Sequence, residues 1–284
     1  MHRLFKNGFW AILALSSWPS FATDNSPVKP LEVGVVPYIS ARALVATYEP
    51  MRLYLEQALD RPVKIYTAAG FRQFFLNAKR GDYDLLVTSS HLARLLQKEH
   101  QFTPLLRYSA GGSSLVMTAL NSPIKNLQDL RGQVIAMPDQ LSLASIVCMT
   151  YLREKGLKSG TDFQLLEVPS FASAILSVQK GEAGAAISAS GALAQMPQEL
   201  RESVHSIMNT GEFISLVLLV NPRLAKSEVE YLNAALLKFG NKSNEGKQFF
   251  SSTGFGAMIP ATEKDMASLD RYMAETKRLL AQSH

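Results

Sequence analysis

The most informative stretch of the chain reads Ser122-Pro-Ile-Lys-Asn-Leu-Gln-Asp-Leu-Arg-Gly-Gln-Val-Ile-Ala-Met137, and after Pro138 it continues as Asp139-Gln-Leu-Ser-Leu-Ala-Ser145. The first part predicts a short capped helix that leads into a buried strand. The second part predicts that this strand opens through small and polar residues onto the N-terminus of another helix. Free backbone N–H groups and the positive end of the helix dipole make such a place suitable for an anion. The stretch therefore predicts an α/β protein with an oxyanion site at a strand end.

The first 22 residues have the pattern of a cleaved secretory signal peptide. The basic Arg3 and Lys6 precede the apolar run 9–15, and Ser20 and Ala22 supply the small residues that a signal peptidase needs. A membrane anchor fits less well, because the apolar run is far shorter than the roughly 20 residues that span a bilayer. We therefore expect residues 1–22 to be removed and the mature protein to reside in the periplasm.

The composition excludes several classes of protein. The formal net charge is only +5, and Arg3 and Lys6 of the expected signal contribute to it. This excess is too small, and the charges too scattered, to indicate a nucleic-acid partner. The single cysteine, Cys148, has no partner for an internal disulfide and is expected to be a buried apolar residue. With five histidines in the whole chain and no clustered spacing, the sequence predicts no metal site and no cofactor.

The first half of the mature chain alternates between strand and helix patterns. Strands are expected at 31–36, 63–67 and 84–88, each short and apolar. Between them, two stretches repeat apolar residues at helical spacing, namely Met51, Tyr54, Leu55, Ala58 and Leu59, and then Phe71, Phe74, Phe75 and Ala78. This β-α-β-α-β order implies a parallel sheet with right-handed crossovers.

A second α/β unit of the same kind follows, with strands expected at 134–137, 163–168 and 183–188. Two similar β-rich runs, Ser113–Leu120 and Ile214–Val220, flank this unit, and we interpret them as segments where the chain crosses between lobes and rejoins the first sheet. The expected division is lobe one at 23–119, lobe two at 120–211, and a second part of lobe one at 212–284. Two crossovers form a hinge, and helices near 227–239 and 263–282 are expected to pack on lobe one.

These elements together resemble a known family. The pattern Ile-x-x-Leu-x-Asp-Leu-x-Gly-x-x-x-Ala at 124–136, the pattern Gly-x-x-Asp-Leu at 81–85, the opening Val-Gly-Val-Val-Pro-Tyr at 33–38 and the helix at 48–56 are similar to those of type II periplasmic binding proteins. More narrowly, the chain resembles the phosphate/phosphite/phosphonate-binding components of ABC transporters. The resemblance implies the α/β, two-lobed type II fold and a small oxyanion bound between the lobes.

The resemblance also implies ligand-binding positions. Tyr38 stands where the family has an aromatic residue after the first strand. The run Thr88-Ser89-Ser90 stands in place of a Tyr-Gly-Pro-like turn, and Ser142 and Ser145 stand in the Ser-Thr-Ser-Gly-like helix start. Phe171 and Gly184 occupy the positions at which the family has a histidine and an aspartate. The resemblance therefore does not identify the particular ligand.

The positions of the polar residues along the chain point to the same strand ends, independently of the resemblance. Ligands of open α/β sheets bind at the carboxyl ends of the strands. Our candidate ligand-binding residues are Tyr38, Thr88, Ser89, Ser90, His91, Ser142, Ser145 and Phe171. Each also has an ordinary alternative. Ser142 can simply cap a helix, Tyr38 can be an aromatic residue at the rim, and His91 can face either the cleft or solvent.

The sequence predicts a binding protein and no catalytic residues. It has no Gly-x-Ser-x-Gly elbow, phosphate-binding loop or His-Glu-x-x-His motif, and its serine-rich loops lack a nearby general base. We expect a monomer that captures a small anion and delivers it to an ABC permease in the inner membrane. The alternative is a sensor that presents the ligand to the ectodomain of a signalling receptor.

Overall fold

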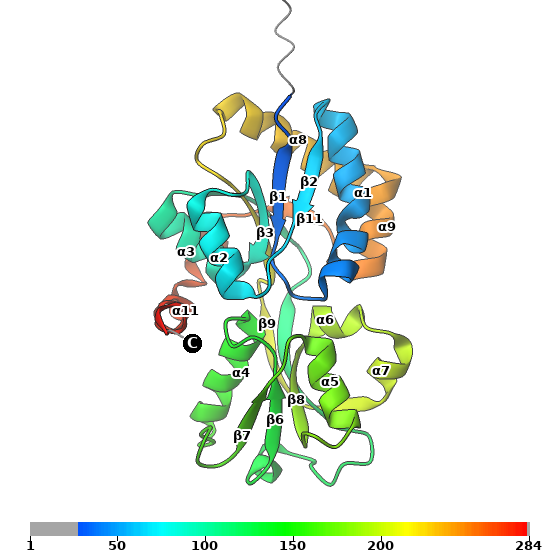
Figure 1. The fold of residues 1–284 in the computed structure, drawn as a ribbon, viewed down its shortest axis with the longest axis vertical. Helices are drawn as coiled ribbons and strands as arrows, with labels where there is room; N and C mark the ends of the chain where they lie inside the picture. The colour runs from blue at the N-terminus through cyan, green and yellow to red at the C-terminus, as the bar shows by residue number, and fades with distance from the viewer. Residues whose placement is uncertain (1–27, 283–284) are drawn as a thin grey trace, which may run out of the picture.

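The computed structural model describes residues 28–282, and the chain forms two lobes, one above the other in Figure 1. The expected signal peptide at 1–22 lies outside the described residues. Each lobe is built on its own mixed sheet with helices packed against it. The predicted α/β fold with two lobes is therefore confirmed.

The sheet of the first lobe has six strands in the order β11-β4-β10-β3-β1-β2. Their bounds are β1 Leu31–Val35, β2 Val63–Tyr66, β3 Leu85–Ser89, β4 Thr103–Tyr108, β10 Leu216–Val220 and β11 Met258–Pro260. β1 pairs in parallel with both β2 and β3, whereas β10 is antiparallel to β3 and β4. The β-α-β-α-β unit expected from the sequence thus forms one half of this sheet.

The sheet of the second lobe has five strands in the order β7-β6-β8-β5-β9. Their bounds are β5 Gly112–Ala119, β6 Val134–Met137, β7 Gln164–Glu167, β8 Ala185–Ala189 and β9 Val204–Phe213. β6 pairs in parallel with β7 and β8, and β5 is antiparallel to β8 and β9. In both lobes, therefore, the first strand of the parallel unit is central and an antiparallel strand lies beside the third.

Helices connect the strands of each lobe. In the first lobe they are α1 Ala41–Leu59, α2 Phe71–Arg80, α3 Ser90–His100, α8 Lys226–Lys242, α9 Asn244–Thr253, α10 Glu263–Ala267 and α11 Asp270–Ala281. In the second lobe they are the 3-10 turn η1 Leu127–Leu130 and the helices α4 Leu143–Glu154, α5 Phe171–Gln179, α6 Ser190–Ala194 and α7 Gln198–Glu202. No helix within residues 28–282 combines the length and the apolar character needed to cross a membrane.

The two β-rich runs that flank the second unit join different sheets. Ile214–Val220 contains β10 and rejoins the first sheet, as expected. The run Ser113–Leu120 instead lies mostly in β5, which is a strand of the second sheet, so the chain leaves the first lobe before Gly112 and not after residue 119. The expectation for this run was wrong because nearly every residue of β5 is buried, and a strand that is buried on both faces has no alternating pattern to indicate which sheet it joins.

The C-terminal region also differs from the expectation of one helix at 263–282. It forms two helices, α10 and α11, whose first residues Glu263 and Asp270 both pair with the guanidinium of Arg94 on α3. The break between the helices lets both carboxylates reach the same guanidinium. The spacing of apolar residues in the sequence does not reveal this break. The helix α9, which begins at the N-cap Ser243, was not expected at all.

We predict that Arg94 anchors the C-terminal helices to the first lobe. Its side chain is only 2% exposed, and it donates to Asp270, Glu263 and Gln97 at 2.6 to 3.0 Å. Arg94→Met should lower the free energy of unfolding by roughly 2 kcal/mol, because it removes a buried cation whose carboxylate partners remain. Urea denaturation measures this loss.

The matched control is Arg278→Met. Arg278 also pairs with an acidic residue, Glu275, but its side chain is 53% exposed. Its loss should cost less than about 1 kcal/mol. Equal effects of the two variants would contradict the anchoring role of Arg94.

Candidate functional site

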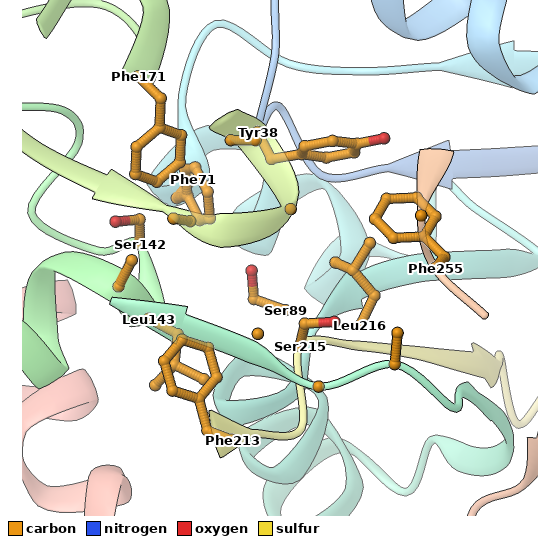
Figure 2. A pocket seen from close by; sticks show the side chains of 18 residues that line it. Tyr38, Phe71, Ser89, Ser142, Leu143, Phe171, Phe213, Ser215, Leu216 and Phe255 are labelled. Atoms are coloured by element: carbon orange, nitrogen blue, oxygen red, sulfur yellow. The ribbon is translucent and has the colours of Figure 1, made fainter. Parts of the chain in front are cut away.

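A pocket lies between the lobes, at the carboxyl ends of their parallel strands. Figure 2 shows its side chains, with Tyr38, Phe71 and Ser89 from the first lobe and Ser142 and Phe171 from the second. Its volume is about 80 Å³. A buried water needs about 10–15 Å³ on this measure, and pockets for drug-sized ligands exceed about 300 Å³. The pocket therefore suits a ligand with only a few non-hydrogen atoms.

Five helices of the described chain begin at this pocket. Phe71 and Phe171 are the first residues of α2 and α5, and Ser89, Ser142 and Ala189 are the N-caps of α3, α4 and α6. The first N–H groups of a helix have no acceptor within the helix, and the helix dipole adds partial positive charge there. Helix starts from both lobes thus create a positive potential in the pocket.

The pocket also holds serine hydroxyls from both lobes. Ser142 caps α4 by accepting the N–H of Ser145 at 3.1 Å, and its own hydroxyl donates to the Ser145 hydroxyl at 2.8 Å. The α4 N–H groups of Leu143 and Ala144, which line the pocket, then have no acceptor within the helix. Ser89, the N-cap of α3, makes no side-chain capping bond. Its side chain lines the pocket beside Ser215, as Figure 2 shows.

Aromatic rings form most of the remaining wall. Phe71, Phe171, Phe213 and Phe255 all line the pocket, together with Leu216. The ring of Phe255 is held by stacking on Tyr108, with centroids 4.7 Å apart, and by edge contact with Tyr38 at 6.0 Å. The wall thus offers apolar contact beside the polar helix starts.

None of the side chains that line the pocket in the described part of the chain is charged. A bound anion would therefore be stabilised by backbone N–H groups, hydroxyls and helix dipoles. Within residues 28–282 there is also no group of three histidine, cysteine, aspartate or glutamate side chains placed to hold a metal ion.

Tyr38 occupies the rim on the side of the first lobe. Its phenol donates to the side-chain oxygen of Gln195 in the second lobe at 3.4 Å. Burial raises the pKa of Tyr38 far above its ordinary value, so the phenol stays protonated. The residue therefore links the two lobes at the pocket and packs its ring against Phe255.

The structure brings four of the eight candidate residues to the pocket: Tyr38, Ser89, Ser142 and Phe171. The other four, Thr88, Ser90, His91 and Ser145, are buried beside it without lining it. Successive residues at a strand end or helix start point in different directions, so only some members of a polar run can face one cavity. Ser90 donates to the backbone oxygen of Ile214, and Ser145 lies behind Ser142 and donates to Pro138 at 3.4 Å.

Gly184 lies outside the site. It directly precedes β8, at the opposite end of that strand from the pocket, and a Cβ at this position would lie 2.5 Å from Gln133 Oε1 and 3.0 Å from Ile124 Cδ1. The residues of this strand and the following helix that line the pocket are Ala189, Gly191 and Ala192. Gly184, the position at which the resemblance implies an aspartate, therefore does not line the pocket.

Several lining residues were missed by the sequence reasoning. Phe71 was counted only as a core residue, and the hinge contributes Ala110, Gly111, Gly112, Phe213, Ser215 and Leu216. The Gly111-Gly112 pair is a turn signal that could have drawn attention to the hinge. Phe255 follows α9, the helix that was not expected, and nothing local in the sequence marks it.

Comparison with known proteins identifies a family for this chain. Residues 33–266 match the family model described as "ABC transporter, phosphonate, periplasmic substrate-binding protein". This match spans most of the chain and both lobes.

Solved structures share the fold at low sequence identity. A binding protein component of an ABC phosphonate transporter from Pseudomonas aeruginosa aligns with a TM-score of 0.76 and 14% identity, over 89% of this chain and 98% of that chain. PhnD1 from Prochlorococcus marinus, solved with methylphosphonate, aligns with a TM-score of 0.77 and 15% identity, over 88% and 99%. The alkanesulfonate-binding protein SsuA from Xanthomonas axonopodis, bound to MOPS, has a TM-score of 0.61 and 14% identity, over 90% and 96%.

We predict that His91 makes the folded protein sensitive to acid. Its Nε2–H donates to the backbone oxygen of Leu141 at 2.9 Å, whereas its buried Nδ1 has no partner among the described residues. Burial lowers the pKa of His91 to about 4. The unfolded state, with a pKa near 6.5, therefore binds a proton first, and stability falls as the pH drops from about 6.5 to about 4. The loss should be about 1.4 kcal/mol for each pH unit inside that window.

Unfolding free energies at pH 7 and pH 5 measure the effect. His91→Gln should reduce the difference between the two values. His205→Gln, at the half-buried histidine of β9 that contacts Thr118 at 3.3 Å, is the control. If wild type and His91→Gln lose the same free energy between the two pH values, the prediction fails.

Proposed function

The chain belongs to the family of periplasmic substrate-binding proteins of phosphonate ABC transporters, and we propose that it captures a small phosphorus oxyanion between its lobes and delivers it to an ABC permease. It is a binding protein and not an enzyme. The ligand class proposed is that of phosphonate, phosphite and phosphate.

One observation carries this proposal: the N-termini of helices from both lobes meet at one small pocket whose lining side chains are uncharged. The pocket joins the starts of α2 and α3 to those of α4 and α5, with the hydroxyls of Ser89 and Ser142 among them. Such groups donate hydrogen bonds to oxyanions and favour negative charge. The small volume supports a compact ligand.

The division of the pocket between two lobes supports a mechanism of capture by closure. A ligand that contacts both lobes gains its full binding free energy only when they are closed, so binding shifts the population of conformations toward the closed form. The hinge at 109–112 and 213–216 is itself part of the pocket wall. Closure then presents one defined surface to the permease.

The apolar wall supports a preference within the ligand class. A buried cationic amine needs a carboxylate or comparable acceptors, since an unpaired charge is strongly unfavourable there. The nearby acid Asp139 is committed to the backbone N–H groups of Phe71 and Leu141, both at 2.9 Å. The rings of Phe71, Phe171 and Phe213 suit a methyl or hydrogen substituent. We therefore propose phosphite or methylphosphonate over 2-aminoethylphosphonate.

Single hydroxyl deletions test the site. Ser89→Ala and Ser142→Ala should each weaken methylphosphonate binding by about tenfold, because each removes a hydroxyl that we expect to donate to the charged ligand, a bond worth roughly 1.5 kcal/mol or more. The Ser142 hydroxyl donates to Ser145 in the ligand-free structure, and we expect it to turn to the ligand on binding. The matched control is Ser177→Ala, at a buried serine of the second lobe that does not line the pocket and donates to Glu182 at 3.0 Å. Calorimetry that finds unchanged affinity in both Ser89→Ala and Ser142→Ala would place the anion elsewhere.

A titration of ligand classes tests the preference. We expect phosphite and methylphosphonate to bind at least about tenfold more tightly than 2-aminoethylphosphonate at one pH and ionic strength. Mass spectrometry of the ligand released from purified protein gives an independent identification. Tighter binding of the aminoethyl compound would show that an acid reaches the pocket, and binding of none of these anions would refute the proposed function.

A further inference from the structure

The turn Asp139–Leu141 belongs to the second lobe but makes specific contacts with the first. It links β6 to the start of α4, directly before Ser142 of the pocket. Its three contacts with the first lobe are a carboxylate bond, a buried side chain and a backbone carbonyl bond.

The carboxylate of Asp139 caps a helix of the opposite lobe. Its Oδ2 accepts the N–H of Phe71, the first residue of α2, at 2.9 Å, and its Oδ1 accepts the N–H of Leu141 in its own turn at 2.9 Å. The α2 helix has no side-chain cap of its own, because its N-cap is Gly70. A Cβ at Gly70 would lie 3.1 Å from Asp139 Oδ2, so glycine leaves room for the carboxylate. The cap that α2 lacks in its own lobe thus comes from across the cleft.

Leu141 adds an apolar and a polar contact. Its side chain is about 1% exposed and packs in the core of the first lobe, although the residue belongs to the second. Its backbone oxygen accepts the Nε2–H of His91, on α3, at 2.9 Å. All these groups would meet water if the lobes separated at the hinge.

From these contacts we propose that the turn Asp139–Leu141 is a latch that favours the closed conformation before any ligand binds, and that Asp139 is its main positioning residue. By holding the turn against α2 and α3, the latch brings the start of α4 and the hydroxyl of Ser142 to the pocket. Asp139 does not line the pocket. The contacts between the lobes do not depend on the proposed function. Only the statement that closure serves ligand binding rests on it.

The latch has a direct consequence for affinity. The apparent affinity of a ligand is its intrinsic affinity multiplied by the fraction of protein in the binding-competent conformation. A latch that keeps part of the ligand-free protein closed therefore tightens binding without touching the ligand. Loss of the latch should weaken binding and speed ligand release, while the pocket groups stay intact.

Distances between the lobes in ligand-free protein test the latch. Spin labels at Lys64→Cys, on β2, and Lys158→Cys, after α4, report lobe separation, because both lysines are exposed and lie in different lobes. The native Cys148 is buried and its pKa is raised to about 12, so it stays unlabelled. Asp139→Ala should raise the open-to-closed ratio by about tenfold, and the nearly isosteric Asp139→Asn by less, because one side-chain oxygen remains as an acceptor.

Asp129→Ala is the matched control. The Asp129 carboxylate also accepts two backbone N–H groups, from Lys125 at 2.9 Å and Asn126 at 3.1 Å, but both lie in its own lobe. It should leave the distance distribution unchanged. An unchanged distribution in Asp139→Ala, or an equal change in Asp129→Ala, would overturn the latch.

Methylphosphonate binding separates this inference from the proposed function. Asp139→Ala should weaken binding by the factor by which the closed fraction falls, whereas Ser89→Ala should weaken binding without opening the ligand-free protein. If wild-type protein binds no phosphorus oxyanion but Asp139→Ala still opens the lobes, the proposed function fails and the latch stands. If binding is confirmed but Asp139→Ala changes neither distance nor affinity, the latch fails and the proposed function stands.

Discussion

The parallel arrangement of strands is the constraint on which the site depends. In each lobe three parallel strands end at the edge that faces the other lobe, and the helices that follow must begin there. Helix starts carry unpaired N–H groups and partial positive charge. Two such edges placed opposite each other surround one pocket with the N–H groups that an anion would need, all of them from the backbone. The topology thus already provides free N–H groups and a positive potential. Ser89, Ser142 and the aromatic wall then modify the polarity and shape of the pocket.

An uncharged pocket has different selectivity from one built on lysine or arginine. Fixed cations attract any anion over a long range, whereas N–H groups at helix starts act over a short range and in defined directions. In the binding mode that we propose, the helix starts contact the oxygens of the ligand, and the size of the cavity and the rings of Phe71, Phe171 and Phe213 select its remaining substituent.

In the described part of the chain, contacts of different kinds join the two lobes, beside the packing of α11 on α4. The hinge strands continue covalently from one lobe to the other, and the contact between Tyr38 and Gln195 bridges the pocket at its rim. The turn at 139–141 crosses the cleft as a helix cap and a buried leucine. The pocket and the turn both meet the first turns of α2, α3 and α4, whereas the contact of Tyr38 with Gln195 joins the segment before α1 to the end of α6.

The sequence by itself determined the fold class, the two α/β units and the edge of the sheet at which the site lies, because alternating strand and helix patterns are local signals. Strand β6 was predicted with its observed bounds, and Tyr38, Ser89, Ser142 and Phe171 were predicted at positions that line the pocket. Only the tertiary structure decided that β5 joins the second sheet, that α10 and α11 separate around Arg94, and that Asp139 caps a helix of the other lobe. Each of these depends on residues distant in sequence that meet only after folding, and neither periodicity nor capping preference records such a partner.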